Sequence, residues 1–427
     1  MSRFTASMMA LATAGMAAVG CGGGDPAATP SLEPPPAGEG VQIVMTSTIE
    51  AHFETERCMF YQVPAEGLYV NREQIKYSPG SHHVLVFKTP YTEVPTTTLR
   101  GETVDTSGVF DCGQNGATGD WNVVGAAGGA QSADGPPGVD GLPSDTAFKI
   151  DGGTLLLVNA HYLNAGDRPL NAQIFINLYT IPAAQVTREA GIFFLYNPFI
   201  HVGAQSSSVA REVCPLATDV TLVNAQSHMH ARGVSYVADL LDASGSKLQE
   251  IYTSRTWQHV VSKQMEPPLT LSAGQMIDFR CNYTNNETHD INQGRTTRDE
   301  MCMFIGLYYP KDTKTEVCSM TSDWSGRYLG ANWIGSGTAN GLSTASCLQT
   351  ATAGGSAEPG AVDACVVDAC PGISAETSTA VRCLATRGMG MCATECGGTP
   401  YDPEVCTPCV REQCTPVMLA LANTACP

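Results

Sequence analysis

Apolar and polar residues alternate over short segments through the middle of this chain, which is the pattern of half-buried β-strands. Between residues 277 and 283 every odd-numbered position is apolar and every even-numbered one is polar. The segments 84–87 and 155–158 are instead continuous apolar runs of strand length. Gly, Pro, Asn and Asp separate such segments, and no stretch between residues 40 and 320 has the period and length of a long helix. The pattern predicts an all-β fold.

Several segments give individual strand predictions. Residues 220–229 are rich in β-branched and apolar side chains and predict one strand. Residues 234–241 and 247–252 flank a turn sequence and predict a hairpin. Residues 301–309 predict a strand with its odd-numbered positions on one face. Between residues 112 and 143 the chain is Gly-rich and predicts a long surface loop. Two antiparallel β-sandwich domains in tandem account for this organisation.

The two ends of the chain differ from this middle. Residues 1–21 contain a short apolar run ending at Gly20-Cys21, which predicts an export signal with a lipoprotein-like cleavage site and a lipid anchor on Cys21. Ordinary signal cleavage nearby is the alternative. Residues 22–41 are mostly Gly, Pro and Ala and predict a disordered tether.

Cysteines concentrate at the C-terminus. Residues 321–346 are rich in Gly, Ser and Thr and predict a linker, whereas residues 347–427 contain ten of the 17 cysteines. This density predicts a small disulfide-rich module. A redox or zinc site at the Cys406…Cys409 spacing is the alternative. Since 17 cysteines exceed what a reducing cytosol explains, we expect an oxidising, exported location in a bacterial cell envelope.

The net charge limits the kinds of partner that this protein is expected to bind. The chain has 41 acidic and 23 basic residues, a net charge of −18. This balance argues against nucleic acid and against an anionic membrane surface as partners. We therefore expect membrane contact only through the lipid anchor, and no sequence feature identifies a partner for the C-terminal module.

Candidate metal ligands lie in both sandwiches. His228 and His230 are two apart on a predicted strand, so their imidazoles share a face. Two imidazoles with the soft thioether of Met301 suit copper better than zinc, magnesium or calcium. The first sandwich carries a second set, which is His82, His83 and His161. Adjacent histidines point to opposite faces of a regular strand, so this set converges only at a strand end or a β-bulge. Otherwise these histidines are core or surface residues.

The ordered set HH, HY, HxH and EMC over residues 42–320 resembles the copper type II, ascorbate-dependent monooxygenases. The resemblance implies two jelly-roll-type domains, 42–185 and 186–320, each with one copper ion, facing each other across an open solvent gap. His82, His83 and His161 would hold the electron-transfer copper. His228, His230 and Met301 would hold the catalytic copper, where O2 meets the substrate. Ascorbate or another one-electron reductant would supply electrons. The resemblance also implies three disulfides, which are Cys58–Cys112, Cys214–Cys318 and Cys281–Cys302.

The sequence departs from the family at Gln226, two residues before HxH, where peptide-hydroxylating members carry an arginine that helps bind the substrate carboxylate. A neutral amide cannot form the bidentate ion pair that arginine forms with a carboxylate, so we expect a small, non-peptide substrate near Gln226. The alternative functions are a non-catalytic copper-binding or copper-delivery lipoprotein, a structural adhesion protein, and a zinc hydrolase. Zinc hydrolysis is the weakest alternative, because Met301 is a poor zinc ligand and no glutamate beside the histidines is placed as a base.

Overall fold

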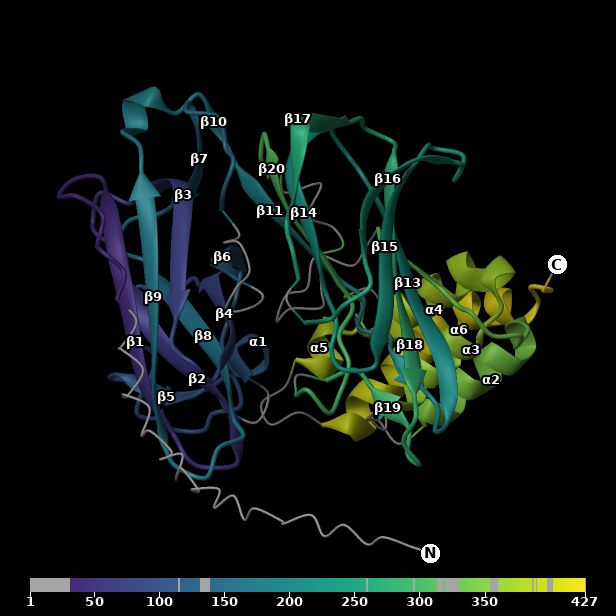
Figure 1. Cartoon of the computed structure of the whole chain (residues 1–427). Helices are drawn as coiled ribbons and strands as arrows, with labels where there is room; N and C mark the ends of the chain where they lie inside the picture. The colour runs from purple at the N-terminus through teal and green to yellow at the C-terminus, as the bar shows by residue number, and fades with distance from the viewer. Residues whose placement is uncertain are drawn as a thin grey trace, which may run out of the picture.

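The chain folds into two β-sandwiches and a helical module, which lie side by side in that order (Figure 1). This computed structural model describes residues 31–426, apart from 114–115, 131–138, 259, 295, 313–317, 319–329, 354–359, 386–387, 389 and 398–401. Cys21 and the segment assigned to a signal peptide lie outside the described residues. No helix in the described ranges combines the length and the apolar character needed to cross a membrane.

The first sandwich is built from two five-stranded sheets with the strand orders β1-β9-β3-β7-β10 and β5-β2-β8-β4-β6. All its pairings are antiparallel except that of β7 with β10. Its strands are β1 (Gly40–Ile49), β2 (Phe53–Gln62), β3 (Leu68–Tyr77), β4 (Ser81–Lys88), β5 (Val109–Asp111), β6 (Gly125–Ala130), β7 (Thr146–Ile150), β8 (Leu155–Asn164), β9 (Leu170–Thr180) and β10 (Arg188–Glu189). A short helix, α1 (Gly116–Asp120), precedes β6, and a 3-10 turn, η1 (Ala183–Gln185), precedes β10.

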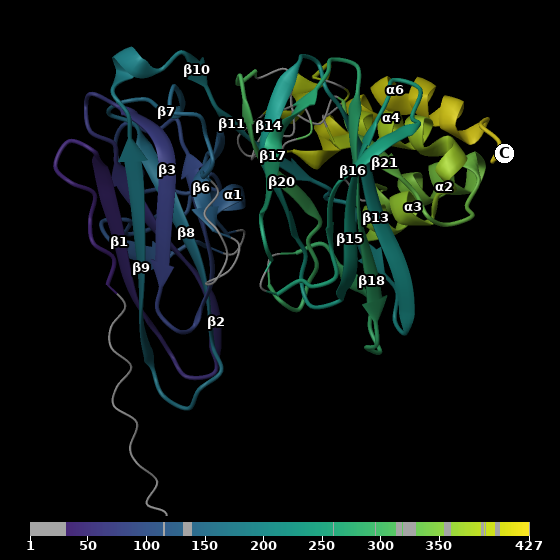
Figure 2. The ribbon, with the colours of Figure 1, turned by 45° about the horizontal axis from the view of Figure 1, so that its top comes forward.

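The second sandwich pairs a sheet of order β11-β20-β14-β17 with one of order β16-β15-β18-β13-β21. Figure 2 shows the first of these sheets facing the N-terminal sandwich. The strands are β11 (Gly191–Tyr196), β13 (Ser206–Pro215), β14 (Val220–His228), β15 (Gly233–Leu241), β16 (Lys247–Ser254), β17 (Lys263–Leu271), β18 (Met276–Asn285), β20 (Met303–Tyr309) and β21 (Asn332–Ile334). A separate two-stranded pair joins β12 (His201–Val202) to β19 (Ile291–Asn292). The hairpin and strands expected in this region are confirmed.

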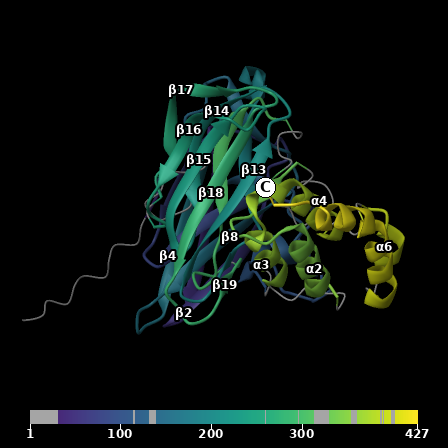
Figure 3. The same cartoon turned by 90° about the vertical axis from the view of Figure 1, so that its right-hand side faces the viewer.

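The cysteine-rich C-terminus is helical and lies against the side of the second sandwich that carries β13 (Figure 3). Its elements are α2 (Gly341–Ala351), α3 (Ala361–Asp368), η3 (Pro371–Ile373), α4 (Ser374–Ala385), α5 (Ala393–Cys396) and α6 (Pro403–Ala422). Five disulfides staple it, so the expectation of a disulfide-rich module is confirmed. Cys406 pairs with Cys396 and Cys409 with Cys392, which removes the CxxC redox or zinc alternative.

The apolar side chains form two large clusters that cross the boundaries between these bodies. One joins the interior of the first sandwich to side chains of β11 and β20, for example through the edge-to-face contact of Phe87 with Phe194. The other joins the interior of the second sandwich to the helical module, since it contains Phe279 of β18 together with Leu348 of α2 and Val366 of α3. Along β20, Met303, Ile305 and Leu307 belong to the first cluster and Phe304 and Tyr308 to the second, so this strand is buried on both faces.

Three expectations about loops need correction. Residues 31–39, assigned to a disordered tether, lie along the first sandwich, because the side chains of Gln42, Lys76 and Asn177 donate hydrogen bonds to their carbonyl groups. The Gly-rich stretch contributes β6 to a sheet, where Gly129 N–H donates to the buried Glu73 carboxylate. The expected linker contains β21, which pairs with β13, and the start of α2. In each case backbone groups gain long-range partners that local composition does not reveal.

Candidate metal centre

His82, His83 and His161 converge at one end of the first sandwich, near the start of β4 and the end of β8. His83 pairs with His161 across β4 and β8, and an extra residue at His82 breaks the register beside them. This bulge at the start of β4 turns two adjacent imidazoles toward the same partner. Ligand atoms of the three histidines all lie within 4.8 Å of one another. His83 and His161 are buried, whereas His82 is partly exposed.

His228, His230 and Met301 belong to one register of the second sandwich. His228 ends β14 opposite Met303 of β20, and this antiparallel register, if extended by two residues beyond β14, sets His230 opposite Met301, just before β20 begins. Directly opposed residues present their side chains on the same face. The rings of His228 and His230 lie 5.2 Å apart, and both side chains are buried.

The two histidine sets meet each other at the domain boundary. The ring centroids of His83 and His228 are 5.5 Å apart in an edge-to-face arrangement, with both side chains only 4% exposed. The expectation of an open solvent gap between the sets is therefore wrong for this structure. The apolar face formed by β11 and β20 packs against the first sandwich, and this contact closes the space between the strand ends that carry the histidines.

Two of the buried ring nitrogens have no hydrogen-bond partner among the described residues. His161 Nε2 donates to Glu54 Oε1 at 2.9 Å, and its Nδ1 is unpartnered. His230 Nδ1 donates to the carbonyl oxygen of Asp299 at 3.1 Å, and its Nε2 is unpartnered. A buried nitrogen without a partner is costly, and a ligating histidine typically binds metal through one nitrogen while the other donates a hydrogen bond. The residues present therefore fit a metal ion.

Burial keeps most of these imidazoles neutral. Desolvation lowers the pKa of His82 to about 4 and that of His230 to about 3, and it holds the pKa values of His83 and His228 well below the usual range. Neighbouring imidazoles add to these shifts, because each disfavours a second positive charge. Neutral imidazole is the form that binds metal, so the cluster is ready for ligation at neutral pH.

Residues 189–328 match the family model described as copper type II ascorbate-dependent monooxygenase, C-terminal domain. The matched segment contains His228, His230 and Met301, which lie at or just beyond the ends of the neighbouring strands β14 and β20. Residues 189–328 are thus similar to the C-terminal domain of the copper type II ascorbate-dependent monooxygenases. His82, His83 and His161 lie outside the matched segment.

Comparison with solved structures adds no functional argument. A crystal structure of peptide-N(4)-(N-acetyl-β-D-glucosaminyl) asparagine amidase is 11% identical, with 62% of this chain and 95% of that chain covered and a TM-score of 0.27. A structure of infectious bursal disease virus strain Gt is 8% identical, with 64% and 74% covered and a TM-score of 0.15. These TM-scores are too low to support an inference on fold or function.

Two carboxylates hold the segments that carry the candidate ligands. Glu300 is fully buried and accepts hydrogen bonds from the backbone N–H groups of His230 and Arg232, which ties the HxH segment to the residue beside Met301. Burial raises the pKa of Glu300 to about 7. Glu54 accepts from His161, and this hydrogen bond is the largest cause that lowers the pKa of Glu54 to about 2.

Sequence reasoning assigned no role to either carboxylate. The position of Glu300 beside Met301 was an available signal, but Glu54 lies 107 residues from His161 and gave none. Two glutamates do stand beside the histidines in three dimensions. Because Glu54 is already bonded to His161, its position does not favour a hydrolytic base.

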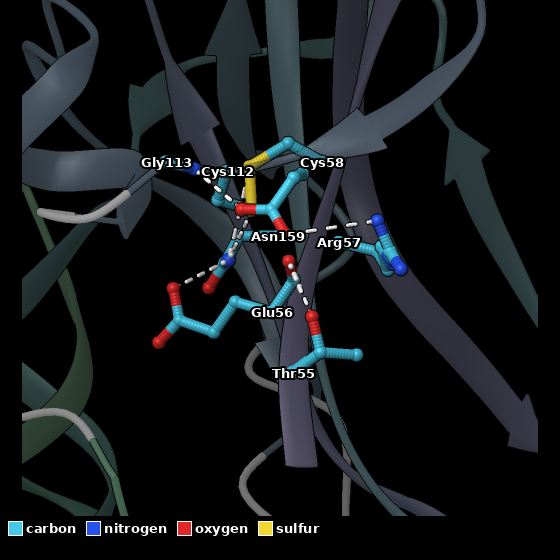
Figure 4. Close-up of a disulfide and its surroundings, with 8 residues drawn as sticks. Thr55, Glu56, Arg57, Cys58, Cys112, Gly113 and Asn159 are labelled. Atoms are coloured by element: carbon cyan, nitrogen blue, oxygen red, sulfur yellow. Dashed lines mark hydrogen bonds and ion pairs between the residues drawn. A yellow bond between two sulfur atoms is a disulfide. The ribbon is translucent and has the colours of Figure 1, made fainter. Parts of the chain in front are cut away.

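The three disulfides that the resemblance implied are present. Cys281–Cys302 lies in the core of the second sandwich, whereas Met301 packs against the cluster on the opposite face, so this bond anchors the ligand segment from behind. Cys58–Cys112 lies under Asn159, whose amide donates to Cys112 Sγ and to Glu56 (Figure 4). Asn159 is two residues before His161 on β8, so this contact supports the strand that presents His161.

A cavity of about 380 Å³ opens beside His82. The indole of Trp257 lies nearly parallel to the His82 ring, with centroids 6.2 Å apart. The lining is otherwise largely polar and includes Arg232, Asn286 and Thr297.

The remaining histidines stand apart from this cluster. His52 and His289 are exposed and lie beside Asp167 and Glu287, and His201 bonds to Asn292. That His289 lies near the candidate metal centre stays a prediction, since its partner Glu287 lines the cavity beside His82. His259 lies outside the described residues.

Proposed function

We propose that this protein hydroxylates a C–H bond of a small, non-peptide molecule with O2, using copper and a one-electron reductant such as ascorbate. The observation that carries the proposal is the convergence of buried, neutral imidazoles on a single edge, within a chain that carries the family's C-terminal domain. One oxygen atom enters the product and the other leaves as water, which requires two electrons and two protons from the reductant.

The donor sets support two copper ions with different roles. His228, His230 and Met301 would hold the ion where O2 and substrate meet, because a neutral thioether favours Cu(I). His82, His83 and His161 would hold an ion that passes electrons. When bound, the copper ions supply the change between Cu(II) and Cu(I) on which O2 activation depends. The protein orients the imidazoles through Glu54 and the Asp299 carbonyl and shields most of them from water.

The cavity beside His82 is the proposed site at which the reductant binds and electrons enter. Only His82 among the five histidines is partly exposed, and it lines the cavity together with Trp257. A small polar reductant bound there would contact the edge of the all-imidazole set. His228, His230 and Met301 do not line this cavity.

Gln226 supports a substrate without a carboxylate. It lies two residues before His228 on β14, its side chain is buried, and its Oε1 has no partner within the part of the chain described. A neutral amide at this position offers hydrogen bonds to a neutral polar group and no ion pair. Efficient hydroxylation of a glycine-extended peptide would contradict this assignment.

The alternative function is non-catalytic copper binding or delivery with the same ligands. Copper stoichiometry followed by ascorbate-dependent O2 uptake over a panel of small substrates separates the two functions. We expect two copper ions per chain and O2 uptake that requires both ascorbate and an organic substrate. Stoichiometric copper binding without substrate-dependent uptake would instead favour the delivery function.

We further propose that the protein is exported and anchored through a lipid on Cys21. The sixteen other cysteines pair within the chain in eight disulfides, as expected for an oxidising compartment. Cys21→Ser is expected to release the protein from the membrane fraction. Unchanged membrane association of this variant would contradict lipidation.

A further inference from the structure

We propose that Glu54 is a positioning residue that joins the two histidine sets across the domain boundary. This inference rests on the proposed function, since it assigns both sets to one copper-dependent reaction. Glu54 lies near the start of β2 in the first sandwich, and its side chain is 17% exposed. It contacts a metal-ligand candidate on its own domain and a loop of the other domain.

The first contact fixes the His161 ring. The carboxylate Oε1 accepts from His161 Nε2 at 2.9 Å. With its proton held on Nε2, the ring leaves Nδ1 unpartnered and able to bind a metal ion within the group of His82, His83 and His161. A carboxylate behind a ligating histidine sets both its tautomer and its orientation.

The second contact reaches the second sandwich. The same Oε1 accepts from the backbone N–H of Thr297 at 3.1 Å, and Oε2 accepts from the Thr297 hydroxyl at 3.3 Å. Thr297 is four residues before Met301, in the segment between β19 and β20. One carboxylate is therefore bonded to both domains at the edge where the histidines meet.

From Thr297 the hydrogen bonds continue to the second histidine set. Arg232 donates from Nη1 to the Thr297 carbonyl at 2.6 Å and from its backbone N–H to Glu300. Glu300 also accepts from His230 N–H, and the Asp299 carbonyl accepts from the His230 ring. The carboxylate of Glu54 thus connects, through one short loop, the orientation of His161 with that of His230.

Glu54→Ala is expected to remove the acceptor for both His161 and Thr297. The amide of Thr297 loses a charged acceptor, so its hydrogen exchange in metal-free protein should accelerate by about tenfold or more, the change expected from losing a hydrogen bond to a charged group. Nitrogen-15 NMR of the histidine rings should show His161 changing from a single Nε2–H tautomer to a mixture. In the copper-loaded enzyme, kcat should fall while KM for the organic substrate stays the same.

Glu56→Ala is the matched control. Glu56 lies two residues along the same strand and bonds to Asn159 within the first domain, so its removal takes away a similar charge without touching Thr297. It should leave the exchange rate and the tautomer unchanged. Glu54→Gln retains an Oε1 acceptor for both His161 and Thr297 and should largely restore both signals.

If Glu54→Ala matched Glu56→Ala in Thr297 exchange and His161 tautomer, the proposal would be overturned. If Glu54→Ala does not fold, Glu54→Gln still tests the proposal. A Thr297 exchange rate and a His161 tautomer like those of wild type would support the proposal. Loss of both signals in Glu54→Gln, while Glu56→Ala keeps them, would overturn it. The two metal-free measurements do not depend on turnover. A wild-type protein that fails to bind copper would therefore defeat the proposed function while leaving the positioning role testable.

Discussion

At the scale of single residues, Met301 carries the chemical difference between the two proposed ligand sets. It would add a thioether to His228 and His230, whereas His82, His83 and His161 offer imidazoles alone. Sulfur ligation favours Cu(I), the state that reacts with O2, and imidazole supports both oxidation states. The register between β14 and β20 places this side chain on the histidine face.

Met301→His is expected to keep copper bound and abolish hydroxylation. The replacement imidazole is a competent ligand but removes the preference for Cu(I). Copper analysis should give unchanged stoichiometry, and X-ray absorption of the reduced protein should lose the Cu–S contribution that wild type shows. Absence of that contribution from wild type, or wild-type activity in the variant, would rule out Met301 as a ligand.

A substitution at Trp257 tests whether electrons enter through the cavity beside His82. Its indole lines the cavity beside His82 and lies nearly parallel to that ring. We expect Trp257→Leu to raise KM for ascorbate several-fold and to leave KM for the organic substrate unchanged, because a flat surface for the reductant is lost. Steady-state kinetics with each substrate varied in turn measure this. A rise in KM for the organic substrate alone would place that substrate in the cavity.

At the scale of elements, a buried carboxyl group of β13 holds the edge strand β21 through a hydrogen bond. Glu212 of β13 is fully buried, and its Oε2 accepts from Trp333 Nε1 of β21 at 3.1 Å. Desolvation raises the pKa of Glu212 well above its usual range. In the folded state this group therefore holds its proton at pH values where the unfolded chain has released it.

This pKa difference makes stability depend on pH. Stability linked to Glu212 is complete below the unfolded pKa, near 4.5, and falls as pH rises toward the folded value, because the folded state binds more protons over that range. Glu212→Gln has no proton to lose, so its melting temperature relative to wild type should increase between pH 5 and pH 8. Thermal unfolding at several pH values measures the difference, and a constant offset would show that Glu212 is not the titrating group.

At the scale of the whole molecule, the helical module and the second sandwich share one apolar core. Trp333, Leu348 and Val366 belong to the same cluster as Phe199 and Tyr236. A disulfide-rich module with few apolar side chains of its own gains its core from the neighbouring domain. The module is thus part of the structure that supports the metal centre.

Ending the chain at residue 330 is therefore expected to destabilise the second sandwich. The change uncovers Phe199 and removes Trp333, and loss of one such buried aromatic side chain typically costs about 3–5 kcal/mol. The truncated protein should unfold several degrees below wild type or aggregate. Leu342→Ala, at a position 63% exposed, serves as a control and should change little. An unchanged melting temperature after truncation would show that the second sandwich does not depend on the removed segment.

The sequence alone determined the local features of this protein. Alternating and continuous apolar runs indicated strands such as β4, β8, β14, β18 and β20, because the period of side-chain direction in a strand is a local property. The order of the histidines and Met301 predicted a set of ligands, which stays a prediction, and the resemblance implied three disulfides that the structure contains. The rule that adjacent residues face opposite sides predicted a strand end or a β-bulge at His82 and His83, and the structure has a bulge at the start of β4.

Only the tertiary structure decided how these parts meet. A strand such as β20, buried on both faces, has no period that identifies its partners, so the packing of β20 on the first sandwich and the 5.5 Å approach of His83 to His228 could not be predicted. Glu54 joins residues 107 and 243 positions away in the chain. Such contacts arise from the complementary shapes of folded surfaces, and no pattern of neighbouring residues encodes them.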